Sequence, residues 1–215
     1  MILTIIYSEV KKMKKHSTLI PVLSFLLTII ISNIGSFVSD GIRLEQLRGN
    51  VLRMHIIANS DSDEDQRLKL CVRDALLAES DELFGGADDL DEADMLAEEK
   101  LPEIREIAER TLREQGCNDE VCAEIVDMDF DERVYGDITM PAGNYRALRI
   151  TIGEAAGHNW WCVMYPPLCI PTAFGITDDR ETERSCFSTG EREILHRPRK
   201  YRVRFAVWDK LKKWF

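Results

Sequence analysis

Two residues in the second half of the chain could together do nucleophilic chemistry. Cys162 lies four residues after His158 within AAGHNWWCVMYPPLC, the stretch from Ala155 to Cys169. A cysteine becomes a nucleophile when a nearby histidine takes its proton. On an extended strand the two side chains would share a face but lie about 13 Å apart, at about 3.3 Å per residue. A thiol hydrolase that uses Cys162 and His158 is therefore one hypothesis, and it requires a turn at residues 157–159.

The same stretch also fits a surface that binds a partner and does no chemistry. Trp160 and Trp161 are adjacent, so on a strand their side chains face opposite ways. One can then pack in the core while the other is exposed, and exposed tryptophans are favoured binding hot spots. Pro166 and Pro167 stiffen the backbone that follows, which lowers the entropy lost on binding. The alternative is that both tryptophans lie in the core and that His158 is merely hydrogen-bonded.

Acidic side chains are frequent, but their positions favour capping and solvation over catalysis. They cluster before two predicted helices, at positions 61, 63, 64 and 65 and again at 88, 89, 91, 92 and 94. Carboxylates that do acid–base work are few and buried. The sequence contains no GxSxG, HExxH, P-loop or EF-hand pattern. We therefore expect no enzyme activity and no cofactor.

The hydrophobic pattern predicts the elements that position these residues. Residues 51–58 alternate as a strand, and Ser62 with Asp65 forms a capping box for the helix that follows. Pro102 either begins or kinks a second helical region. Three further strands are predicted in EVCAEIVDMDF, RALRITIG and NWWCVMY. The predicted fold class is α+β, a mixed sheet of about four or five strands with two main helices, after an N-terminal signal or anchor helix.

The first forty residues are typical of an export signal or a membrane anchor. Lysines at positions 11, 12, 14 and 15 precede an uncharged stretch, Ser17–Ser39. This stretch is long enough to cross a bilayer, and SNIGSFVS at its end holds only mediocre cleavage sites. Cleavage and retention therefore both stay open. The positive-inside rule places everything after Asp40 outside the cytoplasm.

Three parts follow from this pattern: a signal peptide or anchor over residues 1–39, an exported signalling domain over residues 40–175, and a polar linker with a basic tail over residues 176–215. Residues 1–39 hold four lysines and one glutamate, so the exported part carries −10 − 3 = −13 charges. An acidic domain of this kind does not favour nucleic acid as a partner.

Export also changes what the cysteines are expected to do, because disulfides persist outside the cytoplasm. We favour a disulfide between Cys162 and Cys169. It would close a short loop and stabilise the fold by roughly 2.5 kcal/mol. A zinc site with His158 and these two cysteines is less favoured, because structural zinc sites usually show paired short spacings such as CxxC. Cys117 and Cys122 in CNDEVC could add ligands or form a local disulfide.

The basic tail allows two interpretations. Residues 197–215 hold eight lysines or arginines and one acidic residue, interleaved with aromatic side chains. YRVRFAVW alternates like a strand, whereas WDKLKKWF suggests an amphipathic helical turn or two. The tail could therefore lie on an anionic membrane surface or form a last strand with a solvated face.

Two blocks of the sequence together resemble a known family. VLRMHIIANSDSDEDQRLKLCVRDALL and PAGNYRALRITIGEAAGHNWWCVMYPPLC are similar to the signature segments of the stage II sporulation protein R family, over about Gly49 to Phe174. The first block maps the motif onto His55, Asn59, Ser60, Asp61, Asp65, Lys69, Arg73 and Asp74. The second maps it onto Gly157, His158, Asn159, Trp160, Trp161, Cys162, Pro166, Pro167 and Cys169.

The resemblance implies a signalling protein of endospore-forming bacteria and not an enzyme. Such proteins are exported from the forespore into the space between forespore and mother cell. There they trigger a membrane-embedded aspartic protease, which removes the pro-segment of sigma-E. The residues expected to bind this partner are His55, Asn59, Asp61, Gly157, His158, Asn159, Trp160, Trp161, Pro166 and Pro167.

Overall fold

The computed structural model describes residues 2–84, 87, 89–135, 137–166, 184 and 187–214. The elements in chain order are α1 (Ile2–Gly49), β1 (Leu52–Ile57), α2 (Asp63–Ala78), α3 (Ser80–Phe84), α4 (Leu90–Glu99), α5 (Leu101–Glu114), β2 (Val121–Phe130), β3 (Arg133–Tyr135), β4 (Ile138–Met140), β5 (Gly143–Ile152), β6 (Asn159–Tyr165), α8 (Thr189–His196) and α9 (Pro198–Lys212).

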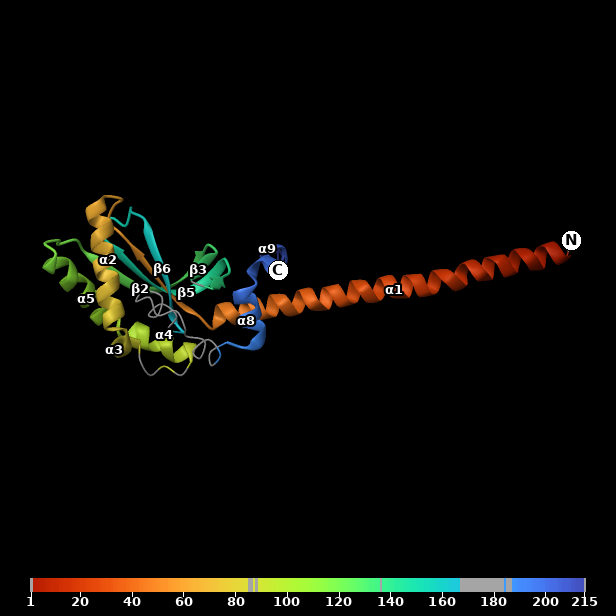
Figure 1. Ribbon diagram of the computed structural model, residues 1–215, viewed down its shortest axis with the longest axis horizontal. Helices are drawn as coiled ribbons and strands as arrows, with labels where there is room; N and C mark the ends of the chain where they lie inside the picture. The colour runs from red at the N-terminus through yellow and green to blue at the C-terminus, as the bar shows by residue number, and fades with distance from the viewer. Residues whose placement is uncertain are drawn as a thin grey trace.

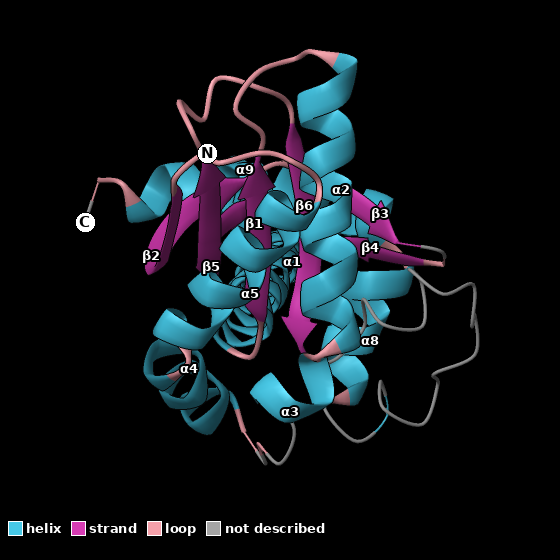
Figure 2. Ribbon diagram, turned by 90° about the vertical axis from the view of Figure 1, so that its left-hand side faces the viewer, coloured by secondary structure: helices cyan, strands magenta, loops and turns pink. Residues whose placement is uncertain are grey.

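The main sheet is mixed and has four strands in the order β2-β5-β1-β6 within the described part of the chain (Figure 2). β1 runs parallel to β5, while β6 lies antiparallel on the other side of β1. The strands β3 and β4 form a separate antiparallel hairpin. The prediction of an α+β fold with a mixed sheet after an apolar N-terminal helix is confirmed.

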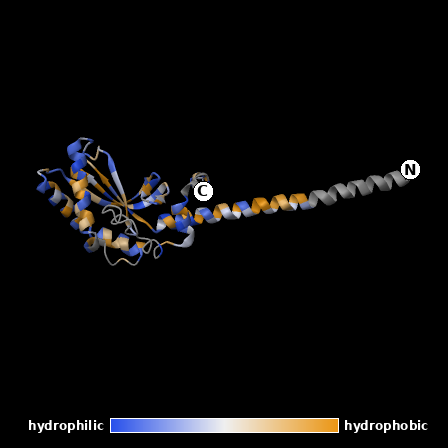
Figure 3. Cartoon of the chain, in the orientation of Figure 1, coloured by the Kyte–Doolittle hydropathy of each residue, from blue (hydrophilic) through white to orange (hydrophobic). Residues whose placement is uncertain are grey.

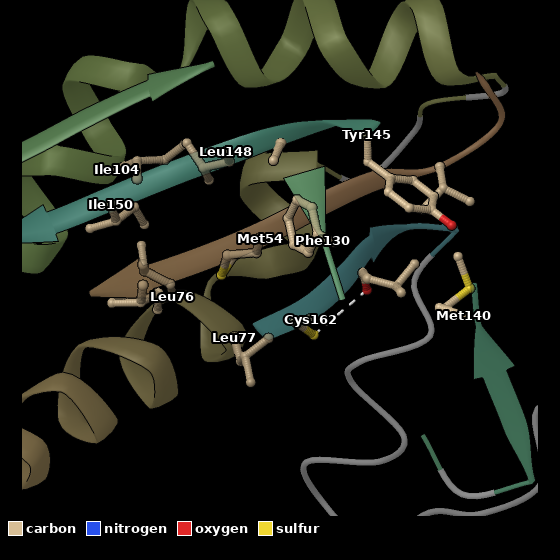
Figure 4. Packing of buried hydrophobic residues seen from close by; sticks show 14 of the residues in the cluster. Met54, Leu76, Leu77, Ile104, Phe130, Met140, Tyr145, Leu148, Ile150 and Cys162 are labelled. Atoms are coloured by element: carbon tan, nitrogen blue, oxygen red, sulfur yellow. Dashed lines mark hydrogen bonds between the residues drawn. The ribbon is translucent and has the colours of Figure 1, made fainter. Parts of the chain in front are cut away.

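One face of the sheet is covered by α2 and α5. Leu76 of α2 and Ile104 of α5 lie over Met54 of β1 and over Leu148 and Ile150 of β5 (Figure 4). All five side chains are buried, and burying a side chain of this size stabilises the fold by about 1.5–3 kcal/mol. This face therefore holds the conventional apolar core.

Local signals in the sequence explain where these two helices begin. Ser62 is the N-cap of α2, and its hydroxyl accepts a hydrogen bond from the Asp65 backbone N–H at 3.1 Å. The Ser62 backbone N–H donates to the Ser60 hydroxyl at 3.2 Å and not to Asp65, so only the first half of the predicted capping box forms. Pro102 lies in the first turn of α5, so it begins this helix and does not kink it.

The first helix extends far beyond the domain. α1 is a single rod whose apolar part, orange in Figure 3, stands clear of the other elements (Figures 1 and 3). Among the described residues, α1 is the one helix that is both long enough and apolar enough to cross a membrane. Its last turns are different, because Leu44 and Leu47 are fully buried in the core. The helix thus runs without a break from the apolar stretch into the domain.

The prediction of a strand over residues 201–208 is wrong, because this segment lies within α9. Pro198 stands in the first turn, where its fixed backbone angle favours a helix. Tyr201, Phe205 and Trp208 recur at helical spacing, and the first two are buried with their rings stacked 5.5 Å apart. α8 and α9 both pack against the base of α1 (Figure 1). The segment has both an alternating, strand-like pattern and a helical spacing of its aromatic residues, and packing against α1 favours the helix.

Candidate functional site

The structure brings the two family-like blocks together at one end of the sheet. β1 and β6 are neighbours, with His55 opposite Trp161 and Ile56 opposite Trp160. The loop after β1 (residues 58–62) meets the loop before β6 (residues 153–158), and we call these two segments the loop junction. Its backbone is joined by hydrogen bonds from Ala156 N–H to the Asn59 carbonyl and from Gly157 N–H to the Ala58 carbonyl, both at 3.0 Å.

Polar side chains of the first block are used inside the loop junction. The Asn59 amide donates to Asp65 at 3.2 Å, and its carbonyl oxygen accepts from the Glu154 backbone N–H at 2.9 Å. The Ser60 hydroxyl also donates to Asp65, and this bond lowers the pKa of the Asp65 carboxyl. Lys69 reaches across from α2 to the His158 carbonyl at 2.9 Å. These side chains therefore hold the junction together.

Two glycines allow the two loops to approach this closely. A Cβ at Gly157 would lie 2.2 Å from the Ser60 carbonyl oxygen, which is backbone and cannot move aside. Gly153 has a φ of +56°, and a Cβ there would lie 2.3 Å from the Asn59 side chain. Gly157, predicted as a binding residue, thus has a structural role in the loop junction.

His158 and Asp61 form the exposed tip of the loop junction. The Asp61 carboxylate accepts from the His158 backbone N–H at 2.6 Å and contacts the imidazole Nδ1 as well. The His158 side chain is 79% exposed and that of Asp61 is 55% exposed. Asn159, the first residue of β6, is exposed beside them. These three predicted residues therefore lie together on the surface.

The two tryptophans point to opposite faces of the sheet, as the alternation of a strand predicts. Trp160 lies on the helix side, where the Arg73 guanidinium is 5.5 Å from its ring centroid. Trp161 lies on the other side, stacked on His55 with ring centroids 3.8 Å apart and in edge contact with Phe130 at 4.8 Å. Both are half-buried. Trp161 has the more extensive ring contacts of the two.

Beneath Trp161 lies a buried cluster that contains His55, which was predicted to bind the partner, and Arg53, which the sequence did not single out. Arg53 is 0% exposed and His55 is 3% exposed, both on the face of β1 opposite Met54. The Arg53 guanidinium lies 3.9 Å from the Phe130 ring centroid and 5.0 Å from that of Tyr145. Within the part of the chain that the structure describes, it donates to the Tyr135 hydroxyl at 2.7 Å, while its Nε and Nη1 have no hydrogen-bond partner there. We name Arg53, His55, Phe130, Tyr145 and Trp161 the aromatic cluster.

Burial controls the charge of the two basic groups in the aromatic cluster. It lowers the pKa of Arg53, and it lowers the pKa of His55 from 6.5 to about 4, with Arg149 and Arg53 acting in the same direction. The Asn159 side chain opposes this shift, although neither ring nitrogen of His55 has a hydrogen bond of normal geometry to any residue that the structure describes. His55 is therefore neutral at pH 7 and acts as an aromatic packing partner. The sequence did contain a signal for this cluster: Arg53 and His55 occupy alternate positions of a strand whose other residues are all apolar.

Cys162, the nucleophile of the thiol hydrolase considered from the sequence, has no free thiol. This residue is buried in β6 and its sulfur is disulfide-bonded. Cys169 and Pro167 lie outside the described residues, so the pairing of Cys162 with Cys169 stays a prediction. Pro166 is described and is buried after a cis peptide bond. A thiol hydrolase that uses Cys162 and His158 lacks its nucleophile.

The other cysteines behave differently. Cys117 and Cys122 are free thiols, so they do not form the local disulfide considered from the sequence. Burial raises the pKa of the Cys117 thiol, which makes it less reactive. In the part of the chain that the structure describes, no three His, Cys, Asp or Glu side chains lie close enough to hold a metal ion.

Comparison with known proteins covers the region that contains both blocks. Residues 48–174 match the family described as Stage II sporulation protein R (spore_II_R). The chain is 42% identical over 118 residues to the stage II sporulation protein R of Bacillus subtilis (strain 168), which is 55% of this chain and 53% of that protein. The match thus spans about half the length of the curated relative. No solved structure is similar. The chain therefore belongs to the stage II sporulation protein R family, a family of sporulation proteins.

Proposed function

We propose that this protein is an exported sporulation signal that activates a membrane-embedded aspartic protease, which then processes pro-sigma-E in the mother cell. The observation that carries this proposal is the loop junction. It brings the exposed members of both family blocks, His158, Asp61 and Asn159, together on one hydrogen-bonded surface next to Trp160. The apolar helix α1 is compatible with export or anchoring in the space between forespore and mother cell.

Activation by binding requires that the signal prefer the active form of the protease. A ligand with equal affinity for both forms of a protein shifts nothing, however tightly it binds. A rigid surface suits this task because little conformational entropy is lost on binding. Internal hydrogen bonds already hold the loop junction in one conformation, which supports its use as a preformed contact.

The contacts of the two tryptophans suggest different roles in this proposal. Trp161 is stacked on the buried His55, so its main role is to support the aromatic cluster. Trp160 is half-buried on the helix side, and Arg73 is the side chain that lies over its ring. We therefore assign the protease contact to Trp160 together with His158, Asn159 and Asp61.

The test is co-expression of this protein with its protease and the pro-sigma-E substrate in a host that does not sporulate. Processing should depend on this protein, and Trp160→Ala should reduce it at least about tenfold, since a hot-spot tryptophan contributes about 2 kcal/mol or more. Met95→Ala is the matched control, because it removes a 71% exposed apolar side chain from α4. Thermal unfolding of both variants checks that they remain folded.

Two outcomes would contradict the proposal. If no processing occurs with all three wild-type proteins present, this protein is not the activator. If Trp160→Ala is folded and processes as fast as wild type, the protease contact lies elsewhere. Resistance of Cys162 to alkylation until reduction would further separate the signalling role from the thiol hydrolase hypothesis.

A second contact, with the membrane surface, is proposed for α9. Val207 and Leu211 are 45% and 44% exposed, and Lys210 and Lys213 are exposed beside them. A helix that shows apolar and basic side chains together binds anionic membranes. Salt-sensitive binding of the protein to anionic vesicles should weaken in the double variant Lys210→Glu, Lys213→Glu. Binding that is unchanged in this variant would remove α9 from the membrane contact.

A further inference from the structure

We propose that α9 is a clasp that keeps α1 attached to the exported domain, because it covers the segment in which a signal peptidase would cut. That segment is SNIGSFVSD, residues 32–40, which ends the apolar stretch of α1. In the structure it is helical, and α9 lies beside it at the base of α1 (Figure 1). This inference rests on the two terminal helices and not on the proposed function.

Trp208 provides the apolar contact of the clasp. Its ring meets Phe37 edge-on, with centroids 5.7 Å apart and planes at 63°. It also lies so close to Gly41 that a Cβ there would be 2.4–2.6 Å from the indole carbons. The absence of a side chain at Gly41 therefore creates the space that Trp208 occupies on α1.

Arg204 provides the polar contact of the clasp, one turn before Trp208. Its Nη1 donates to the Ser36 hydroxyl at 2.9 Å and also to the Asp40 carboxylate. The Asp40 side chain is 7% exposed, whereas that of Arg204 is 38% exposed, so the carboxylate of this ion pair is buried and the guanidinium is partly in contact with water. Arg204 and Trp208 thus contact α1 over fewer than two of its turns, from Ser36 to Gly41.

The contacts continue toward the domain and make the segment costly to unwind. Arg48 of α1 donates two hydrogen bonds to the Asp209 carboxylate, at 2.9 and 3.1 Å. Leu44 and Leu47 are fully buried in the core on the same stretch of α1. Unwinding the end of α1 would therefore break core contacts as well as those of the clasp.

A helix in this position resists proteolysis because a protease cuts the transiently opened state. When opening is fast, the rate of cutting follows the population of that open state. The lysines before the apolar stretch place its other end, residues 32–40, at the outer face of the membrane, where signal peptidase acts. The clasp lowers the open population, so α1 stays joined to the domain as a membrane anchor.

The experiment uses the full chain in a bacterial host, with an improved cleavage site so that a poor site cannot explain resistance. Ile34→Ala changes IGS to AGS and leaves Ser36 in place, and Ile34 is 57% exposed. In this background we compare an intact clasp, Trp208→Ala and Arg204→Ala. Trp214→Ala is the matched control, because Trp214 is 87% exposed near the end of the same chain segment. Immunoblots of membrane and released fractions measure cutting.

We expect the chain with the intact clasp and the Trp214→Ala chain to stay whole and membrane-bound. Trp208→Ala should raise the cut fraction about tenfold, which corresponds to about 1.4 kcal/mol of opening free energy. Arg204→Ala tests the clasp a second time with a milder change, in case Trp208→Ala disturbs the fold. Efficient cutting with the clasp intact would overturn the proposal. So would complete resistance of both clasp variants.

Discussion

On one face of the sheet, Met54 and Ile56 of β1 pack under α2 and α5. On the other face, Arg53 and His55 of the same strand lie under the rings of the aromatic cluster. All four side chains are at most 3% exposed, yet the two faces differ in energetics. Burying the apolar pair is favourable, whereas burying a guanidinium with two nitrogens that lack a hydrogen-bond partner among the described residues costs free energy unless the rings compensate. We infer that the helix face supplies stability and that the aromatic face positions Trp161.

The largest expected effect is on the helix face. Ile56→Ala should lower the free energy of unfolding by about 3–4 kcal/mol, because it removes buried methyl groups and leaves a cavity. Chemical denaturation at pH 7 measures this loss. A loss below about 1 kcal/mol would mean that the core on this face can collapse around the gap.

The next largest expected effect is a pH dependence of stability that comes from His55 on the aromatic face. The folded-state pKa of His55 is about 4 against 6.5 unfolded, so the unfolded state binds the extra proton between these values. The contribution of His55 to the free energy of unfolding is therefore fully present above pH 6.5, and it falls by about 3 kcal/mol as the pH drops to 4. Unfolding curves at several pH values measure this slope.

His55→Phe is the control for the pH effect, because it keeps an aromatic partner for Trp161 and removes the titrating group. The difference between wild type and this variant isolates His55 from the carboxylates, which also titrate in this range. Equal slopes for the two proteins would contradict the assignment.

A smaller effect tests whether the aromatic face needs its buried charge. Arg53→Met keeps most of the side-chain volume and removes a buried charge whose only hydrogen bond within the described residues is to the Tyr135 hydroxyl, so the free energy of unfolding should stay within about 1 kcal/mol of wild type or rise. Thermal unfolding at neutral pH is sufficient as a measurement. A loss of several kcal/mol would show that the contacts with Phe130 and Tyr145 outweigh the cost of burial.

The smallest effect concerns the exposed side of the helix face. Arg73→Ala removes the guanidinium over Trp160 and should lower the free energy of unfolding by about 0.5–1 kcal/mol. In the co-expression assay this variant reports whether Arg73 orients Trp160 for the protease. Folding close to wild type together with reduced processing would assign Arg73 to the contact, and unchanged processing would leave Trp160 to act without it.

Much of this architecture follows from local pattern. Alternation predicted the strand over residues 51–58 and the opposite directions of Trp160 and Trp161, because a strand turns successive side chains to opposite faces. Ser62 and Pro102 marked two helix starts through hydrogen bonding and backbone geometry. The uncharged stretch predicted a helix that can cross a membrane. Each of these features depends on neighbours in the sequence.

Other features were decided only by tertiary structure. Residues 201–208 alternate well enough for a strand, but packing on α1 selects the helix, since most helical stability in proteins comes from such packing. His158 and Asp61 are 97 residues apart and meet only because β1 and β6 pair. Arg53 and His55 are buried because both faces of the central strand are covered. The sequence by itself determined the strands of the main sheet, two helix starts, the apolar N-terminal helix and the family. Long-range contacts, which no local pattern encodes, determined the conformation of residues 201–208 and which side chains became structural and which stayed on the surface.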